Sequence, residues 1–373
     1  MIKYVGMKPR INIARLLLFG AVALILFGGV FALFYFMFRQ RDTSLEYERA
    51  AIEANMDYTV SGDYLSYASD QALIQFHVND VKKSTAIELK APIDGYGVSN
   101  SITAVYSGST LQLRNFDPLP LNGTIRGVAC GRNYCAALRT NEVSGLDSIV
   151  VFTAAAQPLE STIDFSESKV VNFGFETSFN RELLWVICVN TQASLPVTTV
   201  RLYDFNNGGA MSYYPSFYDQ SIEKVFFTEE SVFLIGTEDI IRYSLDSSRE
   251  RYRVGIYGKE VLDMATSATA VRFLLKPRSS GNEHTVYMLS LAEADSPSTT
   301  MLSLYSGENI VNAFLQDDGI RIVTRTRLIS YTYAGRNSSD LELLYPADQA
   351  IELSEKTFLL VSGEDCYLAE RKS

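Results

Sequence analysis

Side chains that could serve as a base in nucleophilic catalysis are sparse in this sequence. The chain has two histidines, His77 and His284. His77 lies in an alternating apolar stretch predicted to be a strand, and His284 ends the polar loop 279–284. A nucleophile needs a base held within hydrogen-bond reach, and neither setting suggests one. The sequence therefore predicts no catalytic histidine.

Two Ser-x-x-Lys strings, 166–169 and 221–224, resemble the nucleophile motif of penicillin-interacting enzymes. Both fall where strands are predicted to begin, and the Ser-Asp-Asn and Lys-Thr-Gly partner motifs are absent from the sequence. The string 255–259 lacks the spacing of a phosphate loop, and 204–209 lacks the alternating carboxylates of a calcium loop. We therefore expect no catalytic, cofactor or metal site from any local motif.

Four cysteines are present, Cys130, Cys135, Cys188 and Cys366. Cys130 and Cys135 flank a four-residue segment that resembles a hairpin turn, which would place two strand ends face to face. A disulfide between them and two separately buried thiols are both compatible with this spacing. There is no Cys-x-x-Cys pair, so zinc or haem ligation is not expected.

Aromatic residues are abundant, with 22 Tyr and 21 Phe, and one cluster stands out. It contains Tyr213, Tyr214, Phe217 and Tyr218 around a proline. Such residues either pack between structural elements or, on a loop, form a binding patch for protein or glycan. The sequence leaves both interpretations open.

Short strands are the elements predicted to carry these residues. Beyond about residue 55, alternating or β-branched runs recur and are bounded by Gly, Asn, Asp or Ser. The clearest unit, residues 222–256, contains four such runs joined by hairpin turns. Similar blocks begin near residues 56, 96, 125, 169, 222, 261, 310 and 350. A four-stranded unit recurring at about 40–45 residues is typical of a β-propeller blade.

We therefore predict an all-β fold, a β-propeller of eight four-stranded blades, with seven blades as the alternative. The last block, residues 350–371, has room for only three strands. Residues 43–50 could supply the missing strand and close the ring. Residues 45–54, however, favour a helix by propensity, so a helical stalk is the competing prediction.

The repeat pattern resembles the tryptophan–aspartate-repeat and quinoprotein-like propellers. The layout is similar to that of membrane-anchored propeller proteins of unknown function from gram-positive bacteria. The resemblance covers roughly residues 56–371 and lies in the periodicity, because no Trp-Asp dipeptide occurs and Trp185 is the single tryptophan. It implies a fold and carries over no catalytic residue.

The N-terminus predicts a membrane anchor. Residues 16–38 form an uncharged apolar run of 23 residues, enough to cross a bilayer core of about 30 Å. The run ends in aromatic residues and Arg39 without a small-residue cleavage site, which favours an uncleaved signal-anchor. Basic residues before it predict a cytoplasmic tail at 1–15, a stalk or ring-closing strand at 39–55, and an extracytoplasmic propeller at 56–373. Gly28 and Ala32 could support a homodimer through this helix.

Charge divides the chain at the same point. Residues 1–41 hold six basic and no acidic residues, whereas the remainder holds 27 basic and 43 acidic, a net charge of −16. Such a domain would be repelled by nucleic acid and by anionic lipid. Nucleic acid is therefore excluded as an expected partner.

These features predict a non-enzymatic interaction scaffold, anchored in the bacterial cell membrane, whose propeller loops bind a protein or glycan in the envelope. The alternative is a propeller hydrolase or lyase acting on envelope glycan through carboxylates of different blades. It requires two acidic side chains that converge in a pocket, one of them buried. No local string of residues supports or excludes this pair.

Overall fold

The computed structural model describes residues 44–372, except 89–91, 160–161, 191, 193, 268–269, 280, 282 and 293–298. The chain divides into one compact unit, Glu46–Glu370, and a second unit of residues 1–45 with 371–373. Most of the second unit lies outside the described residues. The compact unit contains nearly all of the strands.

The strands form eight four-stranded antiparallel sheets, the blades. From the first to the fourth strand, blade 1 is β2 (Thr59–Ser61), β3 (Tyr64–Ser69), β4 (Ala72–His77) and β5 (Asp80–Glu88). Blade 2 is β6 (Gly95–Val98), β7 (Thr103–Ser107), β8 (Thr110–Leu113) and β9 (Leu119–Pro120). Blade 3 is β10 (Thr124–Cys130), β11 (Tyr134–Thr140), β12 (Asp147–Thr153) and β13 (Ile163–Phe165). Blade 4 is β14 (Lys169–Glu176), β15 (Leu183–Asn190), β16 (Val197–Asp204) and β17 (Ala210–Tyr213), with the 3₁₀ turn η1 (Phe205–Asn207) before its last strand.

The remaining blades repeat this plan. Blade 5 is β18 (Ile222–Phe227), β19 (Ser231–Gly236), β20 (Asp239–Ser244) and β21 (Glu250–Gly255). Blade 6 is β22 (Lys259–Ser267), β23 (Ala270–Pro277), β24 (Thr285–Ala292) and β25 (Thr299–Tyr305). Blade 7 is β26 (Ile310–Gln316), β27 (Gly319–Thr324), β28 (Arg327–Tyr331) and β29 (Asn337–Glu342). Blade 8 is β30 (Gln349–Glu352), β31 (Thr357–Ser362), β32 (Asp365–Arg371) and β1 (Leu45–Ala50).

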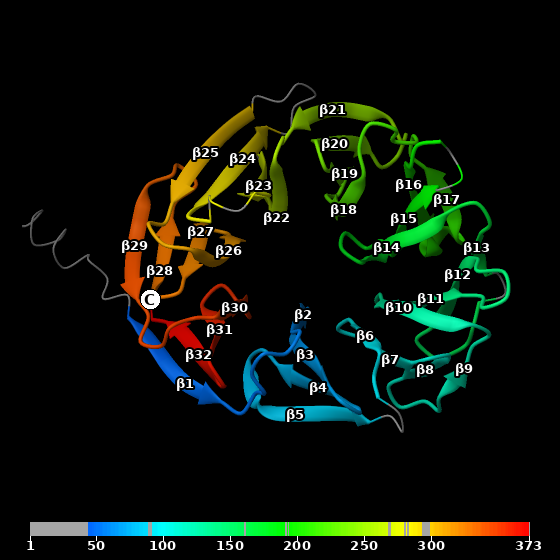
Figure 1. Ribbon diagram of the computed structural model, residues 1–373, viewed down its shortest axis with the longest axis horizontal. Coiled ribbons are helices and arrows are strands. Elements are labelled where there is room, and N and C mark those ends of the chain that lie inside the picture. Colours follow the sequence, from blue (N-terminus) through cyan, green and yellow to red (C-terminus); the bar gives the residue numbers. More distant parts are fainter. Residues whose placement is uncertain are drawn as a thin grey trace, which may run out of the picture. The chain divides into compact units, whose positions relative to one another are not determined.

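The blades stand around a central axis, with the first strand of each blade innermost (Figure 1). The fold is an eight-bladed β-propeller, which confirms the predicted eight blades and excludes seven. Each predicted block begins within three residues of an observed first strand. The ring closes where β1 pairs with β32 as the outermost strand of blade 8, so this segment is a strand and not a helical stalk.

Burial follows from the position of each strand within its blade. All six residues of β19 and of β27 are buried, because these second strands are covered on both faces by neighbouring blades. The fourth strand β29 alternates between exposed and half-buried residues, as expected for the outer edge. Burial on both faces therefore marks these second strands, and alternating burial marks the outer one.

The hydrophobic core is a series of layers between blades. One layer joins Leu183 and Val200 of blade 4 to Val232 and Ile241 of blade 5. The next layer joins Phe233 of blade 5 to blade 6, and the series continues around the ring. Because a single sheet cannot bury both of its faces, each blade depends on its neighbours for stability.

A β-bulge recurs in five first strands, β10, β14, β18, β22 and β26. The bulged residues are Arg126, Val171, Glu223, Leu262 and Val311. A bulge disrupts the backbone ladder and turns one side chain in a new direction. These five positions therefore present side chains that a regular strand would not present.

The predicted membrane span, residues 16–38, lies outside the described residues. Within residues 44–372, gaps excepted, no helix is long and apolar enough to cross a membrane.

Candidate functional site

The two faces of the ring differ in the connections that they carry. Because neighbouring strands are antiparallel, loops from a fourth strand to the next first strand share one face with loops between second and third strands. We name this the crossover face, since the chain crosses from blade to blade there. Loops between first and second strands, and between third and fourth strands, lie on the opposite face.

Exposed apolar side chains favour the crossover face. Thirteen large apolar residues are exposed in the described part of the chain. Six of them lie in crossover-face loops: Val143, Leu146, Leu195, Tyr218, Tyr257 and Leu344. Two lie in opposite-face loops, Phe116 and Phe179, and the other five lie in strands. The two faces therefore differ in the number of exposed apolar side chains that their loops carry.

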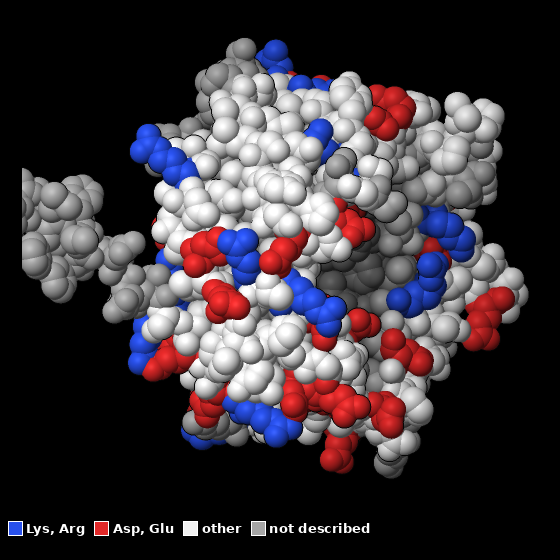
Figure 2. Space-filling model, turned by 60° about the vertical axis from the view of Figure 1, so that its left-hand side comes forward, with Lys and Arg blue, Asp and Glu red and all other residues white. Residues whose placement is uncertain are grey.

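The two faces also differ in the charge of their loops. By sequence, the loops of each face hold twelve acidic residues, but the crossover face has three basic residues and the opposite face six. Of those three, Arg278 and Arg325 are ion-paired with Glu223 and Asp348. Figure 2 shows acidic and basic side chains interspersed over the side of the ring formed by blades 7 and 8. The crossover loops therefore leave more negative charge uncompensated.

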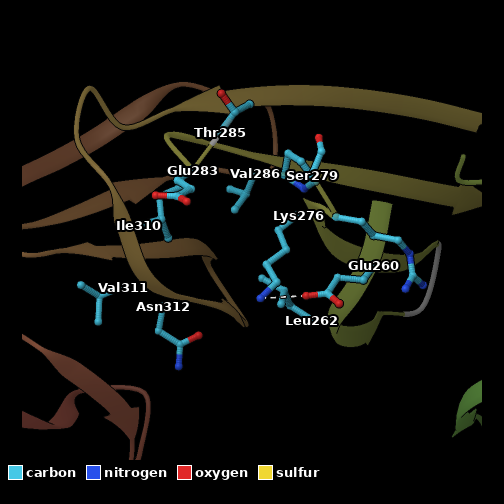
Figure 3. A pocket seen from close by; sticks show the side chains of 12 residues that line it. Glu260, Leu262, Lys276, Ser279, Glu283, Thr285, Val286, Ile310, Val311 and Asn312 are labelled. Carbon is cyan, nitrogen blue, oxygen red and sulfur yellow. Dashed lines mark ion pairs between the residues drawn. The ribbon is translucent and has the colours of Figure 1, made fainter. Parts of the chain in front are cut away.

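Two hollows open on the crossover face. One, of about 750 Å³, lies over the first strands of blades 1 to 4, where the bulged Arg126 and Val171 line it. The other, of about 480 Å³, lies between blades 6 and 7 (Figure 3). Both volumes fall in the range of roughly 300–1,000 Å³ that is usual for ligand pockets. We name the second hollow the blade 6–7 pocket.

The blade 6–7 pocket is built from the starts of β22, β24 and β26 and the end of β23. The two bulged residues Leu262 and Val311 contribute to its apolar wall, together with Val286. Glu283 lies beside Ile310 on one side of the pocket, and Glu260 and Lys276 lie on the other (Figure 3). The backbone amide of Ile310 donates to the carbonyl of Glu283 at 2.8 Å, which ties the loop of blade 6 to blade 7.

Most charges at this pocket are compensated. Lys276 Nζ lies 2.7 Å from Glu260 Oε1, and the hydrogen bond from Lys276 lowers the pKa of the Glu260 carboxyl. Arg278 binds Glu223 of blade 5 through two hydrogen bonds of 3.0 and 2.5 Å. A general acid needs a raised pKa near neutrality, so Glu260 is poorly suited to proton donation. These pairs make the pocket rim rigid.

Polar side chains directly after the bulged residues of β18, β22 and β26 tie neighbouring blades together around the axis; we name Lys224, Asp263 and Asn312 the inner wall. Lys224 donates to the carbonyl of Val261 at 2.6 Å, and Asn312 donates to that of Ala350 at 2.9 Å. Asp263 accepts from the amide of Leu315 at 2.9 Å. Each bond joins one blade to the next.

Asp263 and Asn312 of the inner wall, and Asn172 at the corresponding position of β14, also repair the ladder at the bulges. Asn172, Asp263 and Asn312 each accept a hydrogen bond, at 2.8–2.9 Å, from the backbone amide of the residue that follows. A buried amide without a partner is costly, so these side chains satisfy donors that the bulge disturbs. The inner wall is therefore explained by stability.

Two carboxylates near the axis have raised pKa values. Burial raises the pKa of Asp263 in blade 6, although amide donors lower it in part. Burial also raises the pKa of Glu352 in blade 8, which accepts a 2.5 Å hydrogen bond from Gln316. Raised pKa values mark candidate acids. Neither carboxylate, however, lines either of the two hollows.

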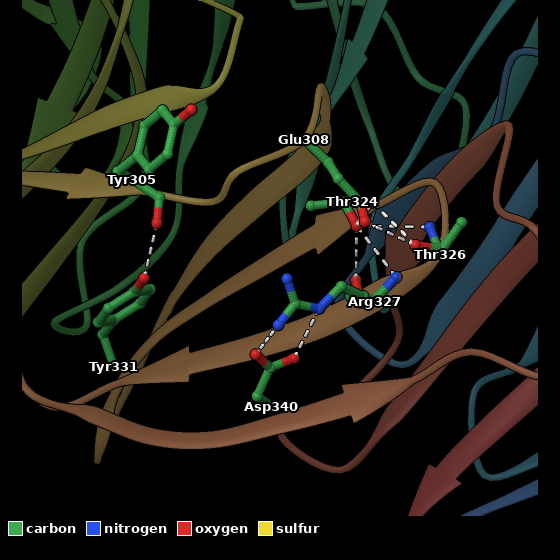
Figure 4. Close-up of polar contacts among 7 residues, drawn as sticks. All are labelled: Tyr305, Glu308, Thr324, Thr326, Arg327, Tyr331 and Asp340. Atoms are coloured by element: carbon green, nitrogen blue, oxygen red, sulfur yellow. Dashed lines mark hydrogen bonds and ion pairs between the residues drawn. The ribbon is translucent and has the colours of Figure 1, made fainter.

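A further carboxylate, Glu308, holds the turn between blades 6 and 7 together (Figure 4). It accepts from the hydroxyls of Thr324 and Thr326 at 2.8–2.9 Å, and these hydrogen bonds lower its pKa. Beside it, Arg327 pairs with Asp340 across two strands of blade 7. The group joins a crossover loop to the blade that follows.

The cysteine pair lies where the hairpin prediction puts it. Cys130 and Cys135 are direct cross-strand partners on β10 and β11, with their Sγ atoms 3.7 Å apart, and both thiols are free. Burial raises the pKa of the Cys130 thiol, which donates to the carbonyl of Gly97 in blade 2 at 3.2 Å. Burial also raises the pKa of Cys188 to about 11. Thiols of this kind are unreactive near neutral pH.

The predicted aromatic patch divides into core and surface. Tyr214 and Phe217 are buried between blades 4 and 5, where Tyr214 packs edge-on against Tyr243. Tyr218 is 70% exposed on the same crossover loop, and the side chain of Tyr213 lies outside the described part of the structure. Among the described side chains of the predicted patch, the packing interpretation therefore applies to Tyr214 and Phe217, whereas Tyr218 is exposed.

The histidines do not assemble a catalytic group. His77 packs edge-on against Tyr64, and His284 against Tyr305. Among the described residues, no three His, Cys, Asp or Glu side chains are grouped as metal ligands. The sequence missed Glu260, Lys276 and Glu283, because the pocket is assembled from two blades. The recurring pattern of an aliphatic residue, any residue and a polar residue in first strands marks the inner wall and gives no signal for these three residues.

The fold places the chain among β-propellers, and comparison with known proteins agrees. No protein-family model and no curated protein matches the sequence. The structure is similar to the WD40 domain of SCAP from fission yeast, with a TM-score of 0.57 and 11% identity over 88% of this chain and 98% of that chain. It is also similar to BamB from Moraxella catarrhalis, with a TM-score of 0.54 and 9% identity over 88% and 99% of the two chains. At such identities the likeness extends to the fold alone.

Proposed function

We propose that this protein is a non-enzymatic scaffold, anchored in the membrane of the bacterial cell envelope, whose crossover face binds a protein or glycan partner. The propeller is a rigid ring that displays many loops, and it needs no catalytic residue to be useful. The structural neighbours support this general role through their shared fold, which is typical of interaction scaffolds.

The observation that carries the proposal is the difference between the faces. Six exposed apolar side chains lie in crossover loops and two in opposite-face loops. Two hollows open on the crossover face, and a third, of about 730 Å³, lies on the opposite face between blades 8 and 1. Apolar anchors next to pockets are the usual basis of binding energy at protein surfaces. The proposed surface therefore includes Tyr218, Tyr257 and Leu344.

Anchoring rests on the sequence. Residues 16–38 are apolar and uncharged, and four basic residues precede them. This arrangement supports an N-terminus in the cytoplasm and a propeller outside it.

The alternative, a hydrolase or lyase acting on envelope glycan, is favoured by one observation. Asp263 and Glu352 come from different blades, and burial raises the pKa of both. Against it, Asp263 accepts two backbone amides and Glu352 accepts from Gln316, so both carboxylates have structural partners. The scaffold accounts for these contacts without a reaction.

Site-specific photo-crosslinking in the full-length, membrane-expressed chain tests the scaffold. A photoreactive amino acid replaces Tyr257 or Tyr218 on the crossover face, and Phe116 or Phe179 on the opposite face as matched controls. The controls are apt because all four side chains are at least 40% exposed. We expect the chain in the membrane fraction and covalent adducts from the two crossover positions at several times the control yield.

Equal adduct yields from both faces, or none at any position, would contradict the proposed face. Recovery of the chain in the soluble fraction would contradict the anchor. Conversion of envelope glycan by the purified chain, abolished by Glu352→Gln, would establish the enzyme instead.

A further inference from the structure

The blade 6–7 pocket offers a partner one uncompensated charge. Glu260 is paired with Lys276, and Arg278 is held by Glu223, so these four charges are neutralised within the protein. Within the described part of the chain, the carboxylate of Glu283 has no hydrogen bond or ion pair. The side-chain hydroxyls of Ser279 and Thr285, which also line the pocket, likewise have no hydrogen-bond partner among the described residues.

The pocket also has an apolar wall of suitable length. Leu262 and Val311 reach it because both are bulged out of their ladders, and Val286 lies between the two charged sides (Figure 3). A long side chain with a cationic head and an aliphatic stem can cover such a wall while its head reaches a carboxylate. Lysine and arginine are the protein side chains with this form.

On the basis of the proposed scaffold function, we infer that the blade 6–7 pocket binds a lysine or arginine side chain of a partner polypeptide. The aliphatic stem packs on Leu262, Val286 and Val311, and the cationic group binds Glu283. The hydroxyls of Ser279 and Thr285 accept further hydrogen bonds, which favours arginine because its guanidinium has five donors.

Other ligand classes fit this pocket less well. An anion would have to displace Glu260 from Lys276 or Glu223 from Arg278, at 2.7 and 2.5 Å. A sugar would meet no aromatic ring among the twelve lining residues on which its face could pack. The pocket chemistry therefore selects a cation with an apolar stem.

The surroundings favour a polypeptide over a free amine. Tyr257 is 70% exposed beside Gly258, whose carbonyl accepts from the amide of Arg278 at the pocket rim. On the other side, Tyr305 is 64% exposed and packs against His284, the neighbour of Glu283. Apolar residues that flank the basic side chain in a partner chain would contact these two tyrosines.

Fluorescence anisotropy with the purified full-length chain tests the pocket. The probes are short labelled peptides with a central arginine, lysine, glutamine or glutamate between two leucines, and an unlabelled N-acetylglucosamine tetramer serves as competitor. The variant Glu283→Gln removes the charge and keeps the size of the side chain. The matched control Glu167→Gln makes the same change in an exposed crossover loop between blades 3 and 4.

We expect the arginine peptide to bind about tenfold more tightly than the glutamine peptide, as for one charge-assisted hydrogen-bonded pair. Glu283→Gln should abolish this preference, and Glu167→Gln should leave it unchanged. Equal affinities for all peptides, no binding by any of them, a preference that survives in Glu283→Gln, or displacement of the arginine peptide by the sugar would overturn the inference. If the crosslinks at Tyr257 persist in that case, the scaffold stands and only this pocket assignment fails.

Discussion

The inner wall and the blade 6–7 pocket both include residues of β22 and β26 and share Asn312, but the polar side chains of the two regions differ in their contacts. In the inner wall, Asp263 and Asn312 each bind two backbone groups, one of them in the neighbouring blade. In the pocket, the carboxylate of Glu283 binds no described group. The first region holds the ring together, whereas the second can hold something else.

This contrast shows that a raised pKa does not by itself identify a functional carboxylate in this propeller. Burial raises the pKa of Asp263, and a raised pKa at a blade interface suggests a functional acid. The contacts show instead that the burial comes from joining two blades. The proposed binding site therefore rests on the carboxylate of Glu283, which binds no described group, and not on a raised pKa.

The strongest destabilisation is expected from Asp263→Ala. The substitution leaves the amides of Leu315 and Met264 without their acceptor between blades 6 and 7. We expect a loss of about 2–3 kcal/mol in the free energy of unfolding, as for unpaired buried donors. Urea denaturation of the full-length chain measures it.

The exposed Asp246→Ala, in a loop of blade 5, serves as control for Asp263. If both variants unfold at the same urea concentration as the parent chain, the inner wall does not stabilise the ring. The comparison between wall and pocket would then lose its basis.

A smaller loss is expected from Asn312→Ala, which removes one donor to Ala350 and one acceptor for the amide of Ala313. Because these are hydrogen bonds of a neutral amide, whereas Asp263 can accept with a charged carboxylate, we expect a loss of about 1 kcal/mol. The same change at the exposed Asn309, three residues earlier, should cost less than about 0.5 kcal/mol. Equal losses in the free energy of unfolding from both changes would show that the hydrogen bonds of Asn312 do not stabilise the ring.

The weakest effect concerns pH. Burial raises the pKa of Glu352, so its contribution to stability is complete below the unfolded value of about 4.3 and is lost as pH rises through the folded pKa. Glu352→Gln keeps the acceptor for Gln316 and removes the charge. We expect this variant to gain about 1 kcal/mol or less relative to the parent between pH 4 and pH 7.

Urea denaturation at both pH values measures this gain, with the exposed Glu364→Gln as control. If the free energy of unfolding of Glu352→Gln depends on pH in the same way as that of the parent chain, ionisation of Glu352 does not destabilise the fold.

Much of the fold could be predicted, because the second strands are largely buried and most of them contain a run of apolar residues. The strand Ser231–Gly236 is one such run, and the neighbouring turns mark its limits. The closing strand was ambiguous, since Leu45–Ala50 contains two glutamates and an arginine that suit a helix. Pairing with β32, more than 300 residues later, overrides that local preference.

The site could not be predicted in the same way. Glu260, Glu283 and Val311 are separated by tens of residues and meet only because blades 6 and 7 are neighbours. The aromatic cluster left two interpretations open for a related reason, since residue type does not reveal that Phe217 faces the core and Tyr218 the solvent. The position of a strand or loop in the ring determines which residues meet and which side chains face the core. A local sequence motif does not encode that position.

Closure of the ring by its first and last strands also sets an order of events during synthesis. Ala50 ends β1 and Asp365 begins β32. At about 5–20 residues per second, roughly 15 to 60 seconds pass before β1 can meet its partner. Throughout that interval β1 has no strand to pair with in its blade, and an open strand edge invites pairing with other chains. A nascent chain of this protein therefore needs protection at its beginning until its end has been made.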